Sequence, residues 1–340
     1  MFKTAIAVIT CLLINGTITT AHAQIPSQTL VIADSALNLN QSILAQNVVH
    51  EVCILEWQTC PNGKSFMEGP GSAALPDNFI SKNGFDHGRS MVSASVKTNP
   101  GIQIIFIRMV GNSSTGTRLN VSGQTIAMVL KWVSDNQNKF NISAVAMSQG
   151  HHVLKSLTKY CPIESTVERL IIGLKETGVP FFVPAGNSRD YERIDWPACI
   201  PEAVAIGGLN EDKSIADYSN LDNALIDYFE VGSMNILGES NSEVRFTGTS
   251  ISVQIAAAKW MLLRGMFPGL SVDELFQRLD QTTTKVSNSK IQAGKVLPTV
   301  IRNPDEQISI QSELDKFSEL KNELAKLRTI IRDLLFMLRR

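Results

Sequence analysis

The stretch RFTGTSISVQIAAAKWMLL, residues 245–263, joins a Gly-Thr-Ser turn to a long run of small and apolar residues. Ser250 stands where a helix formed by this run would begin, and two roles are open to it. It could cap the helix, or it could be a nucleophile at a helix N-terminus, where backbone N–H groups favour developing negative charge. The second role requires a base, an orienting carboxylate and an oxyanion donor elsewhere in the chain.

Strands and helices alternate upstream of this stretch. Five short and almost continuously apolar runs are typical of strands covered on both faces: residues 29–35, 102–110, 142–148, 179–186 and 203–209. Residues 125–140 and 165–178 have helical periodicity, and a further helix at 270–281 opens with the capping-box pair Ser271 and Glu274. The alternation predicts an α/β fold, a doubly wound and mainly parallel sheet flanked by helices. Ligands of such sheets bind at the carboxyl ends of the strands.

Chemically useful residues follow these runs. Asp34 ends the first run, His87 opens a helical stretch, and Asn187 follows the fourth run. Acyl transfer uses a serine nucleophile, a histidine base, an aspartate that orients the imidazole and an amide that binds the oxyanion. Each residue also has a structural explanation: a turn cap for Asp34, a hydrogen-bonded structural histidine, a left-handed turn for Asn187 and an N-cap for Ser250.

Five short motifs contain or flank these residues. In chain order they are Asp34-Ser35, His87-Gly88, Met147-Ser148-Gln149-Gly150, Ala185-Gly186-Asn187 and Gly248-Thr249-Ser250. The set resembles the motifs of the subtilisin-like serine peptidases, or subtilases, which share the order Asp, His, Ser. The resemblance covers roughly Thr29 to Val286.

The resemblance implies a subtilisin-like fold and a role for each motif. Asp34, His87 and Ser250 would be catalytic, with Asn187 and the Ser250 backbone N–H as oxyanion donors. The strand that pairs with the backbone of a polypeptide substrate would contain Ser148, Gln149 and Gly150. No metal or organic cofactor would take part, and no acidic cluster is assigned to calcium.

Several residues depart from the family pattern. Ala36 stands where the family has glycine, and it would be strained if that position needs a positive φ. Arg89-Ser90 replaces Thr-His after His87-Gly88, which places a positive charge near the predicted base. Gln254 replaces a proline, a change that continues a helix without strain, and Glu230-Val231-Gly232 replaces Ala-Pro-Gly.

The first residues are typical of an export signal. Lys3, an apolar run at 5–14 and the A-x-A site Ala21-His22-Ala23 predict a signal peptide at residues 1–23 and a secreted or periplasmic protein. About ten residues then precede Asp34, which leaves no room for a propeptide, so the chain folds unaided or with a separate folding or inhibitory partner. No later stretch is apolar enough to predict a transmembrane segment.

Four cysteines remain after removal of the signal peptide. An even number in an exported chain indicates two disulfides with three possible pairings. We favour Cys53–Cys60 with Cys161–Cys199, because local loops close easily, over metal ligation. The formal net charge of −1 does not favour a nucleic-acid partner.

The domain organisation predicted is a signal peptide (1–23), a peptidase domain (24–300), a linker (301–309) and a coiled-coil helix (310–340). In the last segment apolar residues alternate at spacings of three and four, from Phe317 to Leu338. This pattern predicts a homo-oligomer, although a terminal helix docked on its own domain gives the same pattern. The function predicted is an exported serine endopeptidase. The alternative is a weak or inactive subtilase-fold binding protein, oligomerised by its tail, and a non-peptidase esterase would use the same residues.

Overall fold

The computed structural model describes residues 28–301, apart from 41, 77–83, 114–115, 153–160, 162–164 and 239–241, together with Lys321. The predicted signal peptide lies outside the described residues. So do the linker from residue 302 onward and, except for Lys321, the predicted coiled coil.

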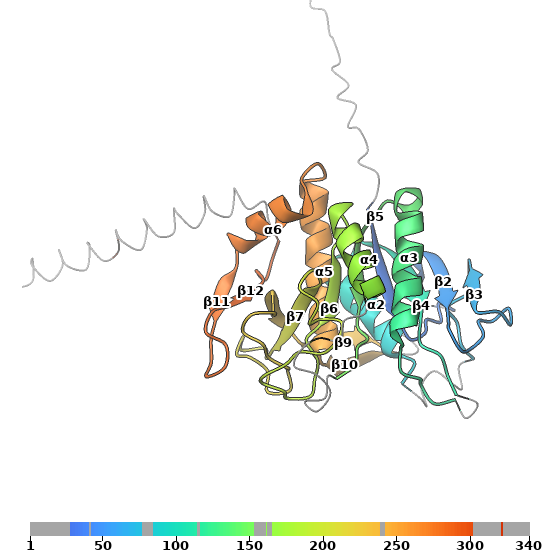
Figure 1. Ribbon diagram of the computed structural model, residues 1–340, viewed down its shortest axis with the longest axis horizontal. Coiled ribbons are helices and arrows are strands. Elements are labelled where there is room, and N and C mark those ends of the chain that lie inside the picture. The colour runs from blue at the N-terminus through green and yellow to red at the C-terminus, as the bar shows by residue number, and fades with distance from the viewer. Residues whose placement is uncertain are drawn as a thin grey trace, which may run out of the picture.

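Within this part of the chain, ten strands form one sheet in the order β11-β12-β8-β7-β6-β5-β1-β4-β2-β3 (Figure 1). The central strands are β1 (Thr29–Asp34), β4 (Gln103–Arg108), β5 (Ile142–Met147), β6 (Phe181–Pro184), β7 (Val204–Leu209) and β8 (Tyr228–Val231). They pair in parallel, and each of the first five lies inside a run predicted from the sequence. These five runs are continuously apolar because helices cover both faces of the sheet.

Two pairs of helices provide that cover. One face carries α3 (Gly123–Phe140) and α4 (Ser165–Glu176), whose apolar residues pack with alternate β1 residues such as Val31 and Ala33. The other face carries α2 (His87–Thr98) and α5 (Thr249–Met266), which pack with Leu30 and Ile32. The helix α6 (Val272–Asp280) follows α5 and begins with the predicted capping box of Ser271 and Glu274. The predicted doubly wound fold is confirmed.

Most of the outer elements of the fold are short. They are the 3₁₀ helix η1 (Ile43–Gln46), the strands β2 (Val48–Ile54) and β3 (Phe66–Glu68), the ribbon of β9 (Ser233–Leu237) and β10 (Glu243–Thr247), and the edge strands β11 (Thr284–Val286) and β12 (Gly294–Val296). These short strands carry weak sequence signals and were not predicted.

Both favoured disulfides are present. Cys53–Cys60 closes the connection between β2 and β3, and Cys161–Cys199 ties the chain before α4 to the chain before β7. Two formed disulfides fit an oxidising compartment.

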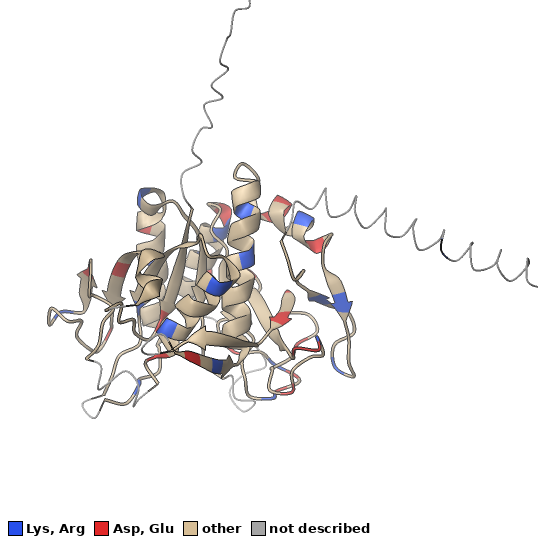
Figure 2. Cartoon of the chain, turned by 180° about the vertical axis from the view of Figure 1, so that it is seen from behind, with Lys and Arg blue, Asp and Glu red and all other residues tan. Residues whose placement is uncertain are grey.

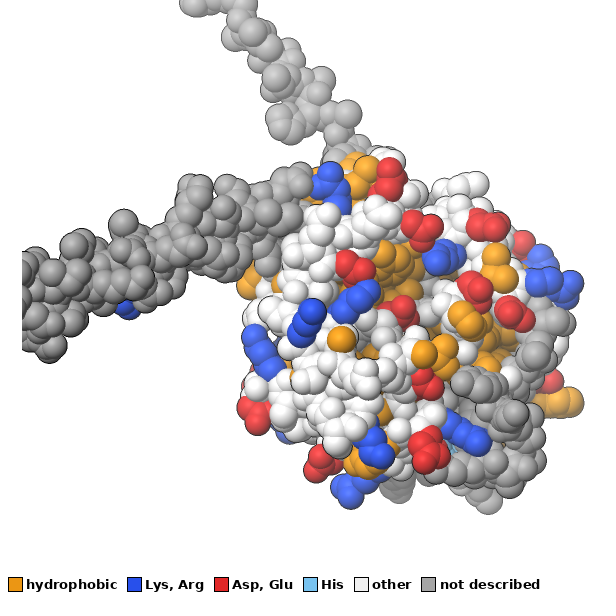
Figure 3. All heavy atoms as spheres, turned by 60° about the vertical axis from the view of Figure 1, so that its left-hand side comes forward, with side chains coloured by type: hydrophobic (Ala, Val, Ile, Leu, Met, Phe, Trp, Pro, Cys, Tyr) orange, Lys and Arg blue, Asp and Glu red, His pale blue; other side chains and the backbone are white. Residues whose placement is uncertain are grey.

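The surface is of mixed charge. Basic and acidic residues are interspersed on the face seen in Figure 2. On the face in Figure 3, charges of both signs are spread out, with hydrophobic side chains visible between them. Of the helices in the described residues, none combines the length and apolar character needed to span a bilayer.

Candidate active site

Asp34 and His87 form a close pair at the carboxyl end of the sheet. Asp34 is the last residue of β1, and His87 is the first residue of α2. The imidazole Nδ1 lies 2.7 Å from Asp34 Oδ1, which also accepts the backbone N–H of Ser35 at 2.6 Å. Asp34 is fully buried, whereas 14% of the His87 side chain is exposed. A buried carboxylate therefore fixes the orientation of an imidazole that reaches solvent.

Close packing at the start of α2 holds this pair together. A Cβ on Gly88 would lie 2.4 Å from the carbonyl oxygen of Ala36, so no larger residue fits there. Ser35 Oγ accepts the backbone N–H of Gly88 at 2.9 Å and donates to the carbonyl of Phe85. Ala36 is not among the residues with positive φ. The strain considered for alanine at this position is therefore absent.

The second oxygen of Asp34 is held by a polar chain. Gln149 Nε2 donates to Asp34 Oδ2 at 3.1 Å, and Arg118 donates to Gln149 Oε1 at 3.1 Å. Burial, the largest influence, raises the pKa of Asp34. The charge and hydrogen bond of His87, the charge of Arg118 and the Ser35 N–H together outweigh burial and hold that pKa below its usual value. Asp34 is therefore ionised at neutral pH.

Arg118 therefore contributes positive charge at Asp34, and no sequence motif predicts this. Arg89, which the sequence places one residue after Gly88, donates to the carbonyl of Asn38 at 3.3 Å. That Arg89 also acts on His87 stays a prediction.

Ser250 lies in the first turn of α5. This helix begins at Thr249, and its N-cap is Gly248, with φ of 152°. The proposal that Ser250 caps the helix is therefore wrong. In the part of the chain that the structure describes, no hydrogen bond engages its hydroxyl, and the residue is 7% exposed.

A buried polar chain connects the elements that carry Ser250 and His87. Ser148 Oγ, just after β5, donates to the carbonyl of Ser250 at 3.2 Å. Gln254 Nε2 donates to Ser148 Oγ at 2.9 Å, and Ser95 Oγ donates to Gln254 Oε1 at 3.0 Å. Ser95 lies on α2. The chain therefore joins α2, α5 and the end of β5, and the family proline could not make these bonds.

Asn187 faces the start of α5. Its Oδ1 accepts the backbone N–H of Thr249 at 2.9 Å and the Thr249 hydroxyl at 3.0 Å. Because the amide oxygen is engaged, the amide Nδ2 is the group left to donate to a ligand. A Cβ on Gly248 would lie 3.4 Å from Nδ2, an ordinary contact, so the φ of 152° rather than lack of space favours glycine at this position.

The matching family model is that of the subtilase family, also called Peptidase S8, and it covers residues 71–296 of the 340. The chain belongs to the subtilase family. Asp34 lies upstream of the matched residues.

Two named serine proteases are similar in sequence to this subtilase. A cuticle-degrading serine protease of Arthrobotrys oligospora is 29% identical over 136 residues, which are 38% of this chain and 30% of that protein. Subtilisin DY of Bacillus licheniformis is 23% identical over 195 residues, which are 56% of this chain and 64% of that protein. The chain thus matches less than two thirds of the length of either relative.

Solved structures share the fold. A cold-adapted subtilisin-like serine proteinase superposes with a TM-score of 0.61 at 18% identity, covering 81% of this chain and 89% of that one. The protease domain of PatA gives a TM-score of 0.61 at 15% identity, with coverages of 80% and 92%. The prenylagaramide maturation protease PagA superposes with a TM-score of 0.57 at 17% identity, covering 78% of this chain and 86% of that one.

The subtilase motifs meet as neighbouring elements. Asp34 contacts His87 and Gln149, Ser148 contacts Ser250, and Asn187 contacts Thr249. The backbone N–H and C=O of Gly150 form no backbone hydrogen bond with any described residue, whereas those of His151 pair with Trp196. Among the described residues, no three His, Cys, Asp or Glu side chains gather as metal ligands.

Sequence reasoning missed three residues of this region. Arg118 follows no recognisable motif, and Phe246, whose ring meets the edge of the His87 ring at 5.4 Å, lies on the unpredicted strand β10. Gln254 was noted only as a mild loss of proline. Gln254 does continue the helix α5, as expected. Its hydrogen bonds could not be expected, because their partners, Ser95 and Ser148, lie more than 100 residues away in the sequence.

The change to Glu230 also has a structural explanation. The buried Glu230 carboxylate lies 2.5 Å from Nζ of Lys259, which is on α5. This ion pair joins β8 to the helix that carries Ser250.

Proposed function

We propose that this subtilase is an exported serine endopeptidase, in which Asp34, His87 and Ser250 form the catalytic triad. The observation that carries the proposal is the Asp34–His87 pair, at 2.7 Å, beside the helix start that presents Ser250. The family membership and the named relatives support the class of reaction.

In the proposed reaction, Ser250 Oγ attacks the carbonyl carbon of a peptide bond and passes its proton to His87 Nε2. Asp34 holds Nδ1 and stabilises the imidazolium that forms. The oxyanion accepts hydrogen bonds from Asn187 Nδ2 and the Ser250 backbone N–H. His87 then protonates the amine as the C–N bond breaks. A water molecule, deprotonated by His87, hydrolyses the acyl-enzyme and restores the serine.

The substrate is proposed to bind as an added strand. Ser148, Gln149 and Gly150 follow β5 at the carboxyl edge of the sheet, and the backbone of Gly150 is available for pairing. The side chains of Ser148 and Gln149 are engaged with Ser250 and Asp34. These two residues therefore offer a substrate their backbone groups, while their side chains support the catalytic residues.

The test is to label the mature protein with a fluorophosphonate probe, which reacts with activated serines. The unmodified protein should label, and Ser250→Ala and His87→Ala should not. Ser287→Ala, at an exposed serine far along the chain, is the matched control and should label normally. A folded protein that does not label contradicts the proposal and favours the binding-protein alternative.

Hydrolysis assays then define the bond that is cut. A peptide amide and the matching ester should both be hydrolysed, with kcat falling ~10⁴–10⁶-fold in the triad variants. Hydrolysis of the ester without hydrolysis of the amide would contradict the peptidase proposal and favour an esterase.

Export is part of the same proposal. The two disulfides support it, because disulfides persist in oxidising compartments. Mass spectrometry of the secreted protein should show Gln24 as the first residue and no free thiol. Recovery of a reduced protein with residues 1–23 still attached would contradict export.

A further inference from the structure

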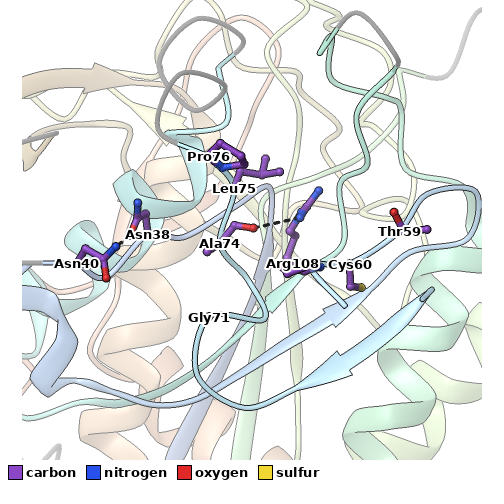
Figure 4. A pocket seen from close by; sticks show the side chains of 10 residues that line it. Asn38, Asn40, Thr59, Cys60, Gly71, Ala74, Leu75, Pro76 and Arg108 are labelled. Atoms are coloured by element: carbon purple, nitrogen blue, oxygen red, sulfur yellow. Dashed lines mark hydrogen bonds between the residues drawn. The ribbon is translucent and has the colours of Figure 1, made fainter. Parts of the chain in front are cut away.

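A pocket of about 540 Å³ lies where the chain leaves β1 and β4 (Figure 4). It is lined by Asn38 and Asn40 after β1, by residues 59–61 after β2, by Gly71, by residues 74–76, and by Arg108 at the end of β4. None of Asp34, His87 and Ser250 lines it. The proposed peptidase reaction therefore leaves this pocket without a role.

Arg108 is the charged group of the pocket. Only 1% of its surface is exposed. Its guanidinium donates to the carbonyl of Ala74 and to Asn112 Oδ1, each at 3.3 Å, and its buried Nε has no partner. A guanidinium has five N–H donors, so these two bonds to uncharged oxygens leave three donors unused.

No carboxylate of the described residues neutralises this charge. Glu51, on the neighbouring strand β2, directs its two oxygens to the backbone N–H groups of Gly71 and Ala73. Burial lowers the pKa of Arg108 to about 10. Because this value is still well above 7, the side chain is cationic at neutral pH.

An uncompensated buried cation is costly unless something pairs with it. The partners that match a guanidinium best are carboxylates and phosphates, which accept two parallel hydrogen bonds. The pocket is also far larger than an inorganic anion requires, and Leu75 and Pro76 give it an apolar wall. These features favour an anion that carries carbon atoms.

We propose that this pocket binds an organic carboxylate, whose oxygens bond the Arg108 guanidinium and whose carbon chain contacts Leu75 and Pro76. Asn40 and Thr59, both exposed, are polar residues that also line it. A free small acid and the C-terminal carboxylate of a peptide share this chemistry.

Calorimetric titration of the full-length Ser250→Ala protein tests the proposal without turnover of the probe. The first pair of probes is N-acetyl-leucine and its neutral amide, and the second is the peptide Ala-Ala-Leu as acid and as amide. At least one acid should bind saturably, and its amide about 10–100-fold more weakly, as expected for a charge-assisted bond. The pair that binds identifies the source of the carboxylate.

Arg108→Met, which keeps an unbranched apolar stem but removes the guanidinium and its charge, should weaken acid binding to the level of the amide. If that variant does not fold, Thr59→Phe provides the test. It adds a bulky ring to the pocket lining at an exposed residue and leaves Arg108 in place. It should weaken binding at least fivefold. Equal binding of acid and amide, equal binding of inorganic phosphate, or unchanged affinity in Thr59→Phe would each overturn the proposal. Because the Ser250→Ala protein is used throughout, these outcomes do not depend on the peptidase activity.

Discussion

Gln254 Nε2 and Ser148 Oγ are joined by a hydrogen bond of 2.9 Å in the interior of the protein. Through this bond, the helix that presents Ser250 is fixed to the end of β5, and Ser95 extends the connection to the helix that presents His87. The position of the serine relative to the histidine therefore depends on a polar chain that proline at position 254 cannot form.

Replacing Gln254 by alanine should impair both stability and catalysis. Ser95 and Ser148 would lose their partners in a buried environment, which should lower the free energy of unfolding by about 1–3 kcal/mol. Because α2 and α5 would be less well fixed, kcat should fall more than KM changes. Chemical denaturation and steady-state kinetics measure these effects. Gln292→Ala, at an exposed glutamine, is the control and should be neutral. If the Gln254 variant kept the stability and kcat of the parent, the polar chain would be needed for neither stability nor catalysis.

Asn187→Ala should lower kcat by about 10²–10³-fold, as the loss of one oxyanion donor does in subtilisin itself. KM should change little, because the amide acts on charge that develops during the reaction. The variant also removes the acceptor of the Thr249 N–H, so its folding must be checked by circular dichroism. A kcat close to that of the parent would exclude Asn187 from the oxyanion site.

Asp227 should make the protein less stable as the pH rises. Burial raises its pKa to about 6, so the folded chain binds this proton more tightly than the unfolded chain. The stabilising contribution is therefore present below about pH 4 and is lost as the pH rises to about 6. Asp227→Asn keeps an oxygen acceptor for the N–H of Ala205 but cannot ionise.

This variant should be more stable than the parent by about 1–3 kcal/mol above pH 6, and by less at pH 4. Thermal unfolding at pH 4 and pH 7.5 measures the difference. The lowered pKa of Asp34 acts in the opposite direction, but it is present in both proteins and cancels. Asp217→Asn, at an exposed aspartate, should show no such pH dependence. A gain for Asp227→Asn that is the same at both pH values would contradict the assignment.

The two disulfides should differ in their contribution to stability. Cys161–Cys199 spans 38 residues and Cys53–Cys60 spans 7. Loop-closure entropy gives about 4 kcal/mol for the first and about 2.5 kcal/mol for the second. Paired Cys→Ser variants, compared by denaturant unfolding, should follow this order. The reverse order would indicate that local packing, rather than loop length, sets their contributions.

The C-terminal heptads are proposed to assemble the protein. A chain that ends at Ile301 should therefore have a lower molar mass per particle than the full chain in light scattering, while its circular dichroism remains that of a folded domain. An unchanged particle mass would favour the terminal helix that docks on its own domain.

The sheet could be predicted from the sequence because its strands are covered on both faces. The runs that became β1, β4, β5, β6 and β7 are apolar at nearly every position, and such runs differ clearly from their surroundings. The strands β9 and β10 escaped prediction because each has five residues and, of the ten, only Ile236 is buried. The three-residue strands β3, β11 and β12 are too short for any periodicity.

The proposed catalytic residues could be picked out from the sequence because each belongs to a short local motif. Their supporting residues have no such local signal. Arg118 reaches Asp34 only through Gln149, and Gln254 acquires its role from side chains on two other elements. Contacts of this kind are set by tertiary packing, which no pattern within a few residues can encode. The same holds for Arg108. Nothing in its local sequence indicates that its side chain is buried, and burial is what makes its charge notable.

The helix α5 has a consequence for how the protein is made. It fills one face of the sheet between α2 and strands β5–β8, yet it is synthesised after all of them. A nascent chain that has emerged only as far as β10 lacks both the nucleophile and the hydrophobic layer that seals this face. Such a chain exposes apolar surface during synthesis and cannot yet carry out the proposed cleavage, because one helix supplies both the last hydrophobic layer and the proposed nucleophile.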